Sequence, residues 1–294
     1  MENIGICLPG GGALCSAQAG ELKALYEWMS AKGIRPKAVR GASGGDLNAS
    51  IFVQAFADGG ESITTMEEMW KTISHRKVHT LIPHIYPRST GLFKLTPLTR
   101  MLRNVISPDK LLQSGIDYSV RASRYGAESD IEVKPSDPSF FEMLTASASY
   151  PGAFKPVKIW GYYWADSGMT NNVPINRCIQ AGCTTIFVVR PYPNSSPKKV
   201  NMRMLYLMGH VLGELMHSQL DAQIAEVNYI NQLVAAGFMT NKRKITLIEI
   251  MPEKESGLGV IDFNARKCSR AFDDGYRSAR KYLVNVAVDS PKTG

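Results

Sequence analysis

Residues 36–47 read PKAVRGASGGDL, a short strand pattern that passes through a tight glycine-rich turn into a helical pattern. Within this stretch, Gly41–Gly45 matches G-x-S-x-G, in which a sharp turn between a strand and a helix exposes a strained serine hydroxyl. The helix that begins at Ser43 directs its positive end toward any oxyanion that develops there. Five-residue matches also arise by chance or in structural turns, so the place of this one between a strand and a helix gives it weight. Ser43 is therefore the candidate nucleophile.

The start of the chain repeats this strand, turn and helix. The apolar run Ile4–Leu8 ends at a proline and three glycines, and apolar residues at helical spacing follow as far as Met29. Two such units predict parallel strands joined by right-handed crossovers. The sequence therefore predicts an α/β fold.

The glycine turn after the first strand is a second candidate site. The backbone N–H groups of Gly10, Gly11 and Gly12 can point into one spot, which suits an oxyanion hole or a phosphate. A nucleotide-binding turn is the alternative, but the G-x-G-x-x-G context is poor and the Lys-Ser/Thr pair of a Walker motif is absent. The oxyanion hole is the favoured interpretation.

The remainder of the chain predicts further strands and helices without a linker between them. Residues 60–135 are less regular, and we expect this insertion to cover the site. We expect a single domain over residues 1–294, with the motifs within about 4–190 and the segment 200–285 completing the fold. The predicted strands are Tyr118–Tyr125, Tyr162–Ala165, Thr185–Val189 and Ile245–Ile250, and the predicted helices are Glu67–Ile73, Leu98–Val105, Phe140–Ser149, Asn201–Val234 and a last helix capped by Asn264.

A serine nucleophile needs a base, and the histidines do not provide an evident one. None of the five lies next to a strand-end motif: His75, His79, His84, His210 and His217. Asp166 is the better candidate, because it follows the aromatic strand Tyr162–Ala165 in an Asp-Ser-Gly turn. A carboxylate in an apolar pocket at a strand end can accept the serine proton directly.

Two further segments each have two interpretations. His75–Arg88 mixes basic and apolar residues, which suits either a lid at a lipid surface or a solvated loop. Four methionines on the predicted long helix could form an adaptable acyl-chain groove, although core packing is the favoured interpretation. They are Met202, Met204, Met208 and Met216.

Composition limits the class of protein. The chain is 44% hydrophobic and 20% charged, without a long low-complexity tract, which is typical of a folded globular protein. Its formal net charge of +8 favours anionic partners. Because the cations are scattered, we expect no nucleic-acid partner, whereas an anionic membrane surface is compatible with this balance.

The cysteines and the N-terminus predict a cytoplasmic protein, attached at most peripherally to a membrane. The start MENIGICLP lacks the features of a signal peptide, and no apolar run reaches the length of a spanning helix. The five cysteines are odd in number and contain no C-x-x-C pair, as is usual in a reducing compartment: Cys7, Cys15, Cys178, Cys183 and Cys268.

Four motifs in order resemble the patatin-like phospholipase family. Residues 10–25 look like the family's glycine-rich opening and first helix, and residues 41–45 match its serine elbow. Residues 145–157, TASASYPGAFKPV, are similar to its Ala/Ser-rich segment that ends in Pro-Gly-x-Phe-x-Pro. Residues 166–174, DSGMTNNVP, resemble its aspartate block.

The resemblance implies a three-layer α/β/α fold with a mainly parallel central sheet. It also implies hydrolysis of acyl esters in phospholipids or lysophospholipids through an acyl-enzyme and a Ser-Asp dyad. In this scheme Ser43 attacks the carbonyl carbon and Asp166 takes and returns the proton. Gly11 and Gly12 hold the oxyanion and Gly10 shapes the loop. No metal or organic cofactor is expected.

Two departures from the family pattern bear on activity. Leu14 and Cys15 occupy the positions of the usual Arg-Gly, and Ser167 stands where glycine is usual. Loss of the arginine removes a positive group near the oxyanion loop. The missing arginine motivates one alternative to the hydrolase, a catalytically silent lipid-binding or regulatory protein. An acyltransferase is another alternative because it shares the serine elbow, but it would be expected to use a histidine as base, and none is well placed.

Overall fold

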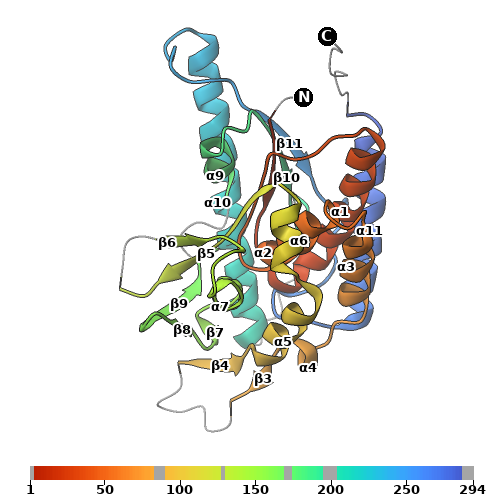
Figure 1. Ribbon diagram of the computed structural model, residues 1–294, viewed down its shortest axis with the longest axis vertical. Helices are drawn as coiled ribbons and strands as arrows, with labels where there is room; N and C mark the ends of the chain where they lie inside the picture. Colours follow the sequence, from red (N-terminus) through yellow and green to blue (C-terminus); the bar gives the residue numbers. More distant parts are fainter. Residues whose placement is uncertain (1–2, 83–89, 127–129, 169–173, 195–203, 287–294) are drawn as a thin grey trace.

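The computed structural model describes residues 3–82, 90–126, 130–168, 174–194 and 204–286. A mainly parallel sheet lies between two layers of helices (Figure 1). The described strands of the central sheet are, in spatial order, β11 (Thr246–Ile250), β10 (Thr185–Val189), β1 (Ile4–Leu8), β2 (Ala38–Gly41), β5 (Asp117–Arg124), β9 (Tyr162–Asp166) and β8 (Val157–Ile159), while β6 (Asp130–Val133) pairs with β5.

The alternation of side chains along the buried strands creates the two helical layers. In β1, Ile4 and Ile6 pack on the face covered by α1 (Cys15–Ala31), α2 (Gly44–Ala55) and α11 (Ala265–Leu283). Cys7 packs on the opposite face, against α9 (Ile175–Gln180) and α10 (Met204–Ala235). Because both faces are covered, these strands are apolar throughout.

Helices α1 and α11 pack closely on the right of Figure 1, beside α3 (Glu61–Lys71). Glycines at the crossing allow this contact. A Cβ atom at Gly20 would lie 2.0 Å from the Phe272 carbonyl oxygen, and one at Gly275 would lie 2.2 Å from that of Ala17. The packing of the last helix against the first therefore depends on glycine in both.

The described residues of 74–105, within the predicted insertion, and the later segment 140–154 form the lower part of the molecule in Figure 1. A second, small sheet there has the order β3 (Thr80–Leu81), β4 (Gly91–Lys94) and β7 (Gly152–Phe154). The helices in this region are α4 (His75–Val78), α5 (Thr96–Val105), α6 (Pro108–Gln113) and α7 (Phe140–Ser147). A short 3₁₀ helix, η1 (Gly12–Leu14), connects β1 to α1.

The structure confirms the predicted fold class, an α/β fold with a mainly parallel sheet flanked by helices. Asn264 caps α11 as predicted, because its side-chain oxygen accepts a hydrogen bond from the Lys267 N–H at 3.1 Å. The helix predicted at Glu67–Ile73 was wrong in its limits, since α3 begins at Glu61. Among the described residues, no helix has the length and apolar character needed to cross a membrane.

Candidate active site

Ser43 occupies a strained turn between β2 and α2. Its φ of 53° and ψ of −130° place it in a left-handed conformation that residues other than glycine rarely adopt. The flanking glycines make the turn sterically possible. A Cβ atom at Gly41 would lie 2.6 Å from the Asp46 Cα, and one at Gly45 would lie 2.1 Å from the Leu8 carbonyl oxygen.

Asp166 ends β9 and is almost completely buried, with 1% of its surface exposed. Its N–H donates to the Ser149 carbonyl oxygen at 3.1 Å, and its Oδ1 accepts from the Gly168 N–H at 2.7 Å. Among the described residues, Oδ2 has no hydrogen-bond partner of regular geometry. One carboxylate oxygen is therefore held in place and the other is left open for a proton.

Burial raises the pKa of Asp166 from its ordinary value of 3.8 to about 7. The Ser43 hydroxyl and the Gly168 N–H lower the pKa against this rise, so the predicted nucleophile lies near the predicted base. A pKa near neutrality suits a group that must accept a proton and then return it.

The glycine loop, Gly10–Gly12, lies beside Ser43 and is held in place by contacts with Val260. The Ala13 N–H donates to the Val260 carbonyl oxygen at 2.7 Å, and a Cβ atom at Gly12 would lie 2.1 Å from the same oxygen. Gly12 also has a φ of 55°, so only glycine fits this position without strain. Within the part of the chain that the structure describes, the N–H groups of Gly11 and Gly12 have no protein acceptor.

An apolar cavity of about 400 Å³ opens next to Ser43. Its volume falls within the range of roughly 300–1,000 Å³ that is usual for ligand sites. The cavity is lined by Gly12, Ser43, Gly44, Leu47, Met69, Trp70, Ile73, Val78, Leu92, Leu95, Leu98, Met101, Ala148, Tyr150, Ala153, Phe154, Leu207, Val211, Leu215, Met216, Val260, Ile261 and Phe263.

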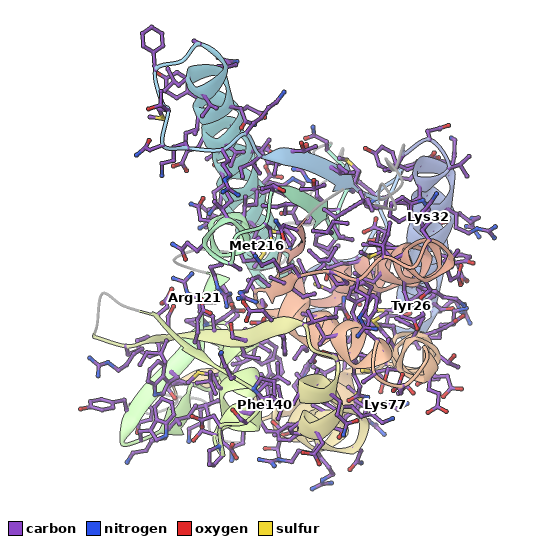
Figure 2. The ribbon with its side chains drawn as sticks, turned by 45° about the horizontal axis from the view of Figure 1, so that its top comes forward. Tyr26, Lys32, Lys77, Arg121, Phe140 and Met216 are labelled. Atoms are coloured by element: carbon purple, nitrogen blue, oxygen red, sulfur yellow. The ribbon has the colours of Figure 1, made fainter. Side chains whose placement is uncertain are left out.

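The described part of the insertion forms one wall of this cavity, through residues such as Val78 and Leu98. Residues 83–88 of the predicted lid lie outside the described residues. Met216 of α10 (Figure 2) is buried in a small core cluster with Val260, as the favoured interpretation expects, and it also lines the cavity. Met202 and the side chains of Met204 and Met208 lie outside the described residues.

No described histidine side chain hydrogen-bonds to Ser43 or Asp166. The His217 ring stacks on Tyr192 with 3.6 Å between ring centroids. His75 and His79 lie against each other and Phe263, and burial lowers the pKa of His79 to about 4. His84 and the His210 side chain fall outside the described residues.

Asp46, in the first turn of α2, was missed by the sequence analysis. Its carboxylate accepts a hydrogen bond from the Ser147 hydroxyl at 2.5 Å, and burial raises its pKa to about 6. Its negative charge in turn raises the pKa of Asp166. Helix α2 is buried along its whole length, and Asp46 is the acidic residue in its first turn, directly after the serine elbow. A charged residue in an otherwise uncharged helix next to a nucleophile is the signal that could have identified it.

A network of buried polar side chains hydrogen-bonds to the backbone next to the glycine loop. The Gln18 side-chain amide donates to the carbonyl oxygens of Pro9 and Val189, at 3.0 and 2.9 Å. Asn48 donates to the Gln18 side-chain oxygen at 2.9 Å and accepts from the Trp70 indole N–H at 2.8 Å. The network joins the end of β1 to α2, and thus the glycine loop to the serine elbow.

The structure explains both departures from the family pattern. Leu14 packs beside Met216 and Val260, so a large apolar side chain suits the position of the usual arginine. Cys15 is buried, and burial raises the pKa of its thiol, consistent with a packing role. The Ser167 hydroxyl donates to the Arg121 carbonyl oxygen at 3.4 Å. Residues 169–173 of the aspartate block lie outside the described residues.

A sequence model of the patatin-like phospholipase family matches residues 6–179, more than half of the chain. The chain belongs to this family. Among solved structures, VipD from Legionella pneumophila is similar to 96% of the present chain, at 12% identity and a TM-score of 0.44. The chain spans 66% of the length of VipD. No curated protein matches it.

The match ends at residue 179. Val260, which clamps the glycine loop, and Met216, which lines the cavity, therefore both lie beyond it.

Proposed function

We propose that the protein hydrolyses fatty acyl esters of phospholipids or lysophospholipids through a dyad of Ser43 and Asp166. The proposal rests on one observation above all. Ser43 stands in a left-handed elbow, interacts with a buried carboxylate whose pKa is about 7, and opens into an apolar cavity.

In the first half of the reaction, ionised Asp166 takes the proton of the Ser43 hydroxyl while the oxygen attacks the ester carbonyl carbon. The negative charge on the carbonyl oxygen is held by the N–H groups of Gly11 and Gly12, in the loop that Gly10 enters. Collapse of the tetrahedral intermediate breaks the ester bond, and the departing alcohol takes the proton from Asp166. The fatty acyl group is then bound to Ser43.

In the second half, Asp166 takes a proton from a water molecule, whose oxygen attacks the acyl carbonyl carbon. The bond to Ser43 breaks, the Ser43 oxygen regains a proton from Asp166, and the fatty acid leaves. The apolar cavity is suited to the acyl chain, because most of its lining is apolar and offers hydrophobic burial. Neither half-reaction needs a metal or an organic cofactor.

The test is release of free fatty acid from mixed phospholipid vesicles by the wild-type protein, Ser43→Ala and Asp166→Asn. We expect hydrolysis by the wild type alone, and labelling of the wild type but not Ser43→Ala by a fluorophosphonate. If all three proteins are inactive and the fluorophosphonate fails to label the wild type, the proposal is wrong and a silent lipid-binding protein takes its place. Transfer to an added alcohol in excess of hydrolysis would indicate an acyltransferase.

A further inference from the structure

The turn between β8 and β9 carries a cluster of exposed aromatic side chains. We call Tyr125, Trp160, Tyr162 and Tyr163 the aromatic tip. About half of each side chain is exposed, with values of 50, 49, 53 and 50%. Tyr125 belongs to this group because its N–H donates to the Tyr163 carbonyl oxygen at 3.0 Å. Aromatic side chains contribute much binding energy when they are buried against a partner.

Trp160 is held in a backbone conformation that disfavours a large side chain. Ile159 pairs with Tyr162, so the turn has two central residues, Trp160 and Gly161, with φ values of 53° and 83°. Positive φ at both positions is the type I′ pattern, in which Asn-Gly is preferred. The indole makes one ring contact in the described structure, edge-on to Trp164 at 5.7 Å. The strained and half-exposed tryptophan is therefore poorly accounted for by packing alone.

The aromatic tip is exposed on both faces of the hairpin. Tyr163 pairs with Lys158, which places the two side chains on one face. Tyr162 lies on the other face, where the Arg124 guanidinium is 4.5 Å from the centre of its ring. A flat protein partner would contact the rings on one face of the hairpin only. A lipid interface surrounds an inserted hairpin and can contact the rings on both faces. Tryptophan and tyrosine are the residues enriched at that interface.

Charge around the aromatic tip favours an anionic partner. Lys155 and Lys158 are exposed, and neither has an ion-pair partner among the described residues. The acidic groups of β6, which lies across β5 from β9, are engaged within the fold. Asp130 pairs with Arg121, and Glu132 pairs with Arg177 at 2.5 Å.

The aromatic tip lies close to the candidate active site along the chain. Phe154 lines the cavity and precedes β8, while β9 leads from Tyr162 to Asp166 over about 13 Å. In Figure 1, β8 and β9 lie beside β7 and β4, whereas the C-terminal end of α10 projects at the opposite end of the molecule. A lipid surface at the tip would thus be near the cavity wall.

We propose that the aromatic tip and its lysines insert into the interface of an anionic lipid bilayer and bring the cavity to its substrate. This inference rests on the proposed function in that the lipid surface also supplies the substrate. The lysines hold the protein to the anionic head groups, and the rings occupy the boundary between head groups and acyl chains.

Binding is measured by co-sedimentation with vesicles of phosphatidylcholine, with and without phosphatidylglycerol, in a Ser43→Ala background that leaves the lipid intact. Trp160→Asn preserves the turn as Asn-Gly and is expected to weaken binding about tenfold. Lys155→Gln with Lys158→Gln is expected to weaken binding to the anionic vesicles about thirtyfold.

The far end of α10 supplies matched controls. Phe238 is 80% exposed there, and Lys242 and Lys244 lie nearby in the sequence. Phe238→Asn removes one exposed aromatic ring, and Lys242→Gln with Lys244→Gln removes the same charge as the test pair. Neither control should change binding. Equal losses in test and control variants, or no loss in the test variants, would overturn the proposal.

Intrinsic fluorescence gives a second measurement. Of the four tryptophans, Trp70 and Trp164 are buried, Trp28 is half-buried and Trp160 is the most exposed. Lipids brominated on their acyl chains should therefore quench the parent protein and not Trp160→Asn. Absence of quenching, or of any vesicle binding by the parent, would contradict bilayer insertion and favour an acidic protein partner.

The two proposals can fail separately. Binding is tested without turnover, so an absence of fatty acid release by the wild type would leave the binding result intact. Conversely, hydrolysis of a soluble short-chain ester by a wild type that does not bind vesicles would support the dyad and refute the lipid-anchoring role of the aromatic tip.

Discussion

Relative to the wild type, Asp166→Asn is expected to become more stable as the pH rises, even though the substitution should abolish hydrolysis. The pKa of this carboxyl is raised from 3.8 to about 7 because burial disfavours its charge. A carboxyl group with a raised pKa in the folded state does not lower the free energy of unfolding below pH 4. Between the unfolded and the folded pKa it lowers this free energy increasingly, and above pH 7 the loss is constant. Removing the charge removes this loss.

The size of the effect follows from the shift. A difference of about three pKa units, at 1.36 kcal/mol each, corresponds to about 4 kcal/mol. The asparagine oxygen can still accept the hydrogen bond from the Gly168 N–H, but its new amide group has no described acceptor of regular geometry. That cost does not depend on pH. The stability difference between variant and wild type should therefore rise by about 4 kcal/mol from pH 4 to pH 8.

Urea unfolding followed by circular dichroism at pH 4, 6 and 8 measures this difference. Asp58→Asn is the matched control, because hydrogen bonds from Ser62 and Lys110 lower the pKa of Asp58 overall against its desolvation. Loss of the Asp58 carboxylate should lower the free energy of unfolding at neutral pH, and should lower it less as the pH falls through the native pKa of Asp58. If the effect of Asp166→Asn does not change with pH, Asp166 is not a buried carboxylate poised near neutrality, and the argument for it as the base is refuted.

Three further predictions concern the site and the helix packing. The kcat/KM for a soluble ester should rise with pH through about 7 as Asp166 ionises, and a flat profile between pH 5 and 8 would contradict that role. Asp46→Asn should move this rise to lower pH, because the Asp46 charge raises the pKa of Asp166; an unmoved or upward-shifted profile would show that the two carboxylates are not coupled in this way. Gly275→Ala should lower the free energy of unfolding by at least about 2 kcal/mol, since its Cβ atom would lie 2.2 Å from a carbonyl oxygen in α1. Urea unfolding of Gly275→Ala beside the helical control Gly213→Ala, whose added Cβ atom would meet no atom within 4 Å, tests the steric origin of the loss.

The features that the sequence predicts well are local ones. Buried parallel strands have continuous apolar runs, and the serine elbow is specified by five adjacent residues, so β1, β2, β10 and the conformation of Ser43 were accessible from the sequence. Asp166 was accessible because it directly follows a recognisable aromatic strand.

The remaining features depend on contacts between distant segments. Val260 approaches the glycine loop through its backbone, and no side-chain pattern marks a carbonyl oxygen as an acceptor. Met216 carries the same apolar signal whether it fills a core or lines a cavity. The strands β7 and β8 have too few residues to show a hydrophobic periodicity. The turn between β8 and β9 was not predicted because Trp160, at its first central position, is not a turn-forming residue.

The hydrogen bond from Ala13 to Val260 has a consequence for the order in which the protein is made. The ribosome supplies Ser43 first and Asp166 later, and about 90 residues more must be added before Val260 exists. At roughly 5–20 residues per second, this interval lasts on the order of 5–20 s. Throughout it, the Ala13 N–H lacks its acceptor and Gly12 lacks the carbonyl group that crowds it in the finished protein. A nascent chain thus carries both proposed catalytic side chains before the glycine loop has its final contacts.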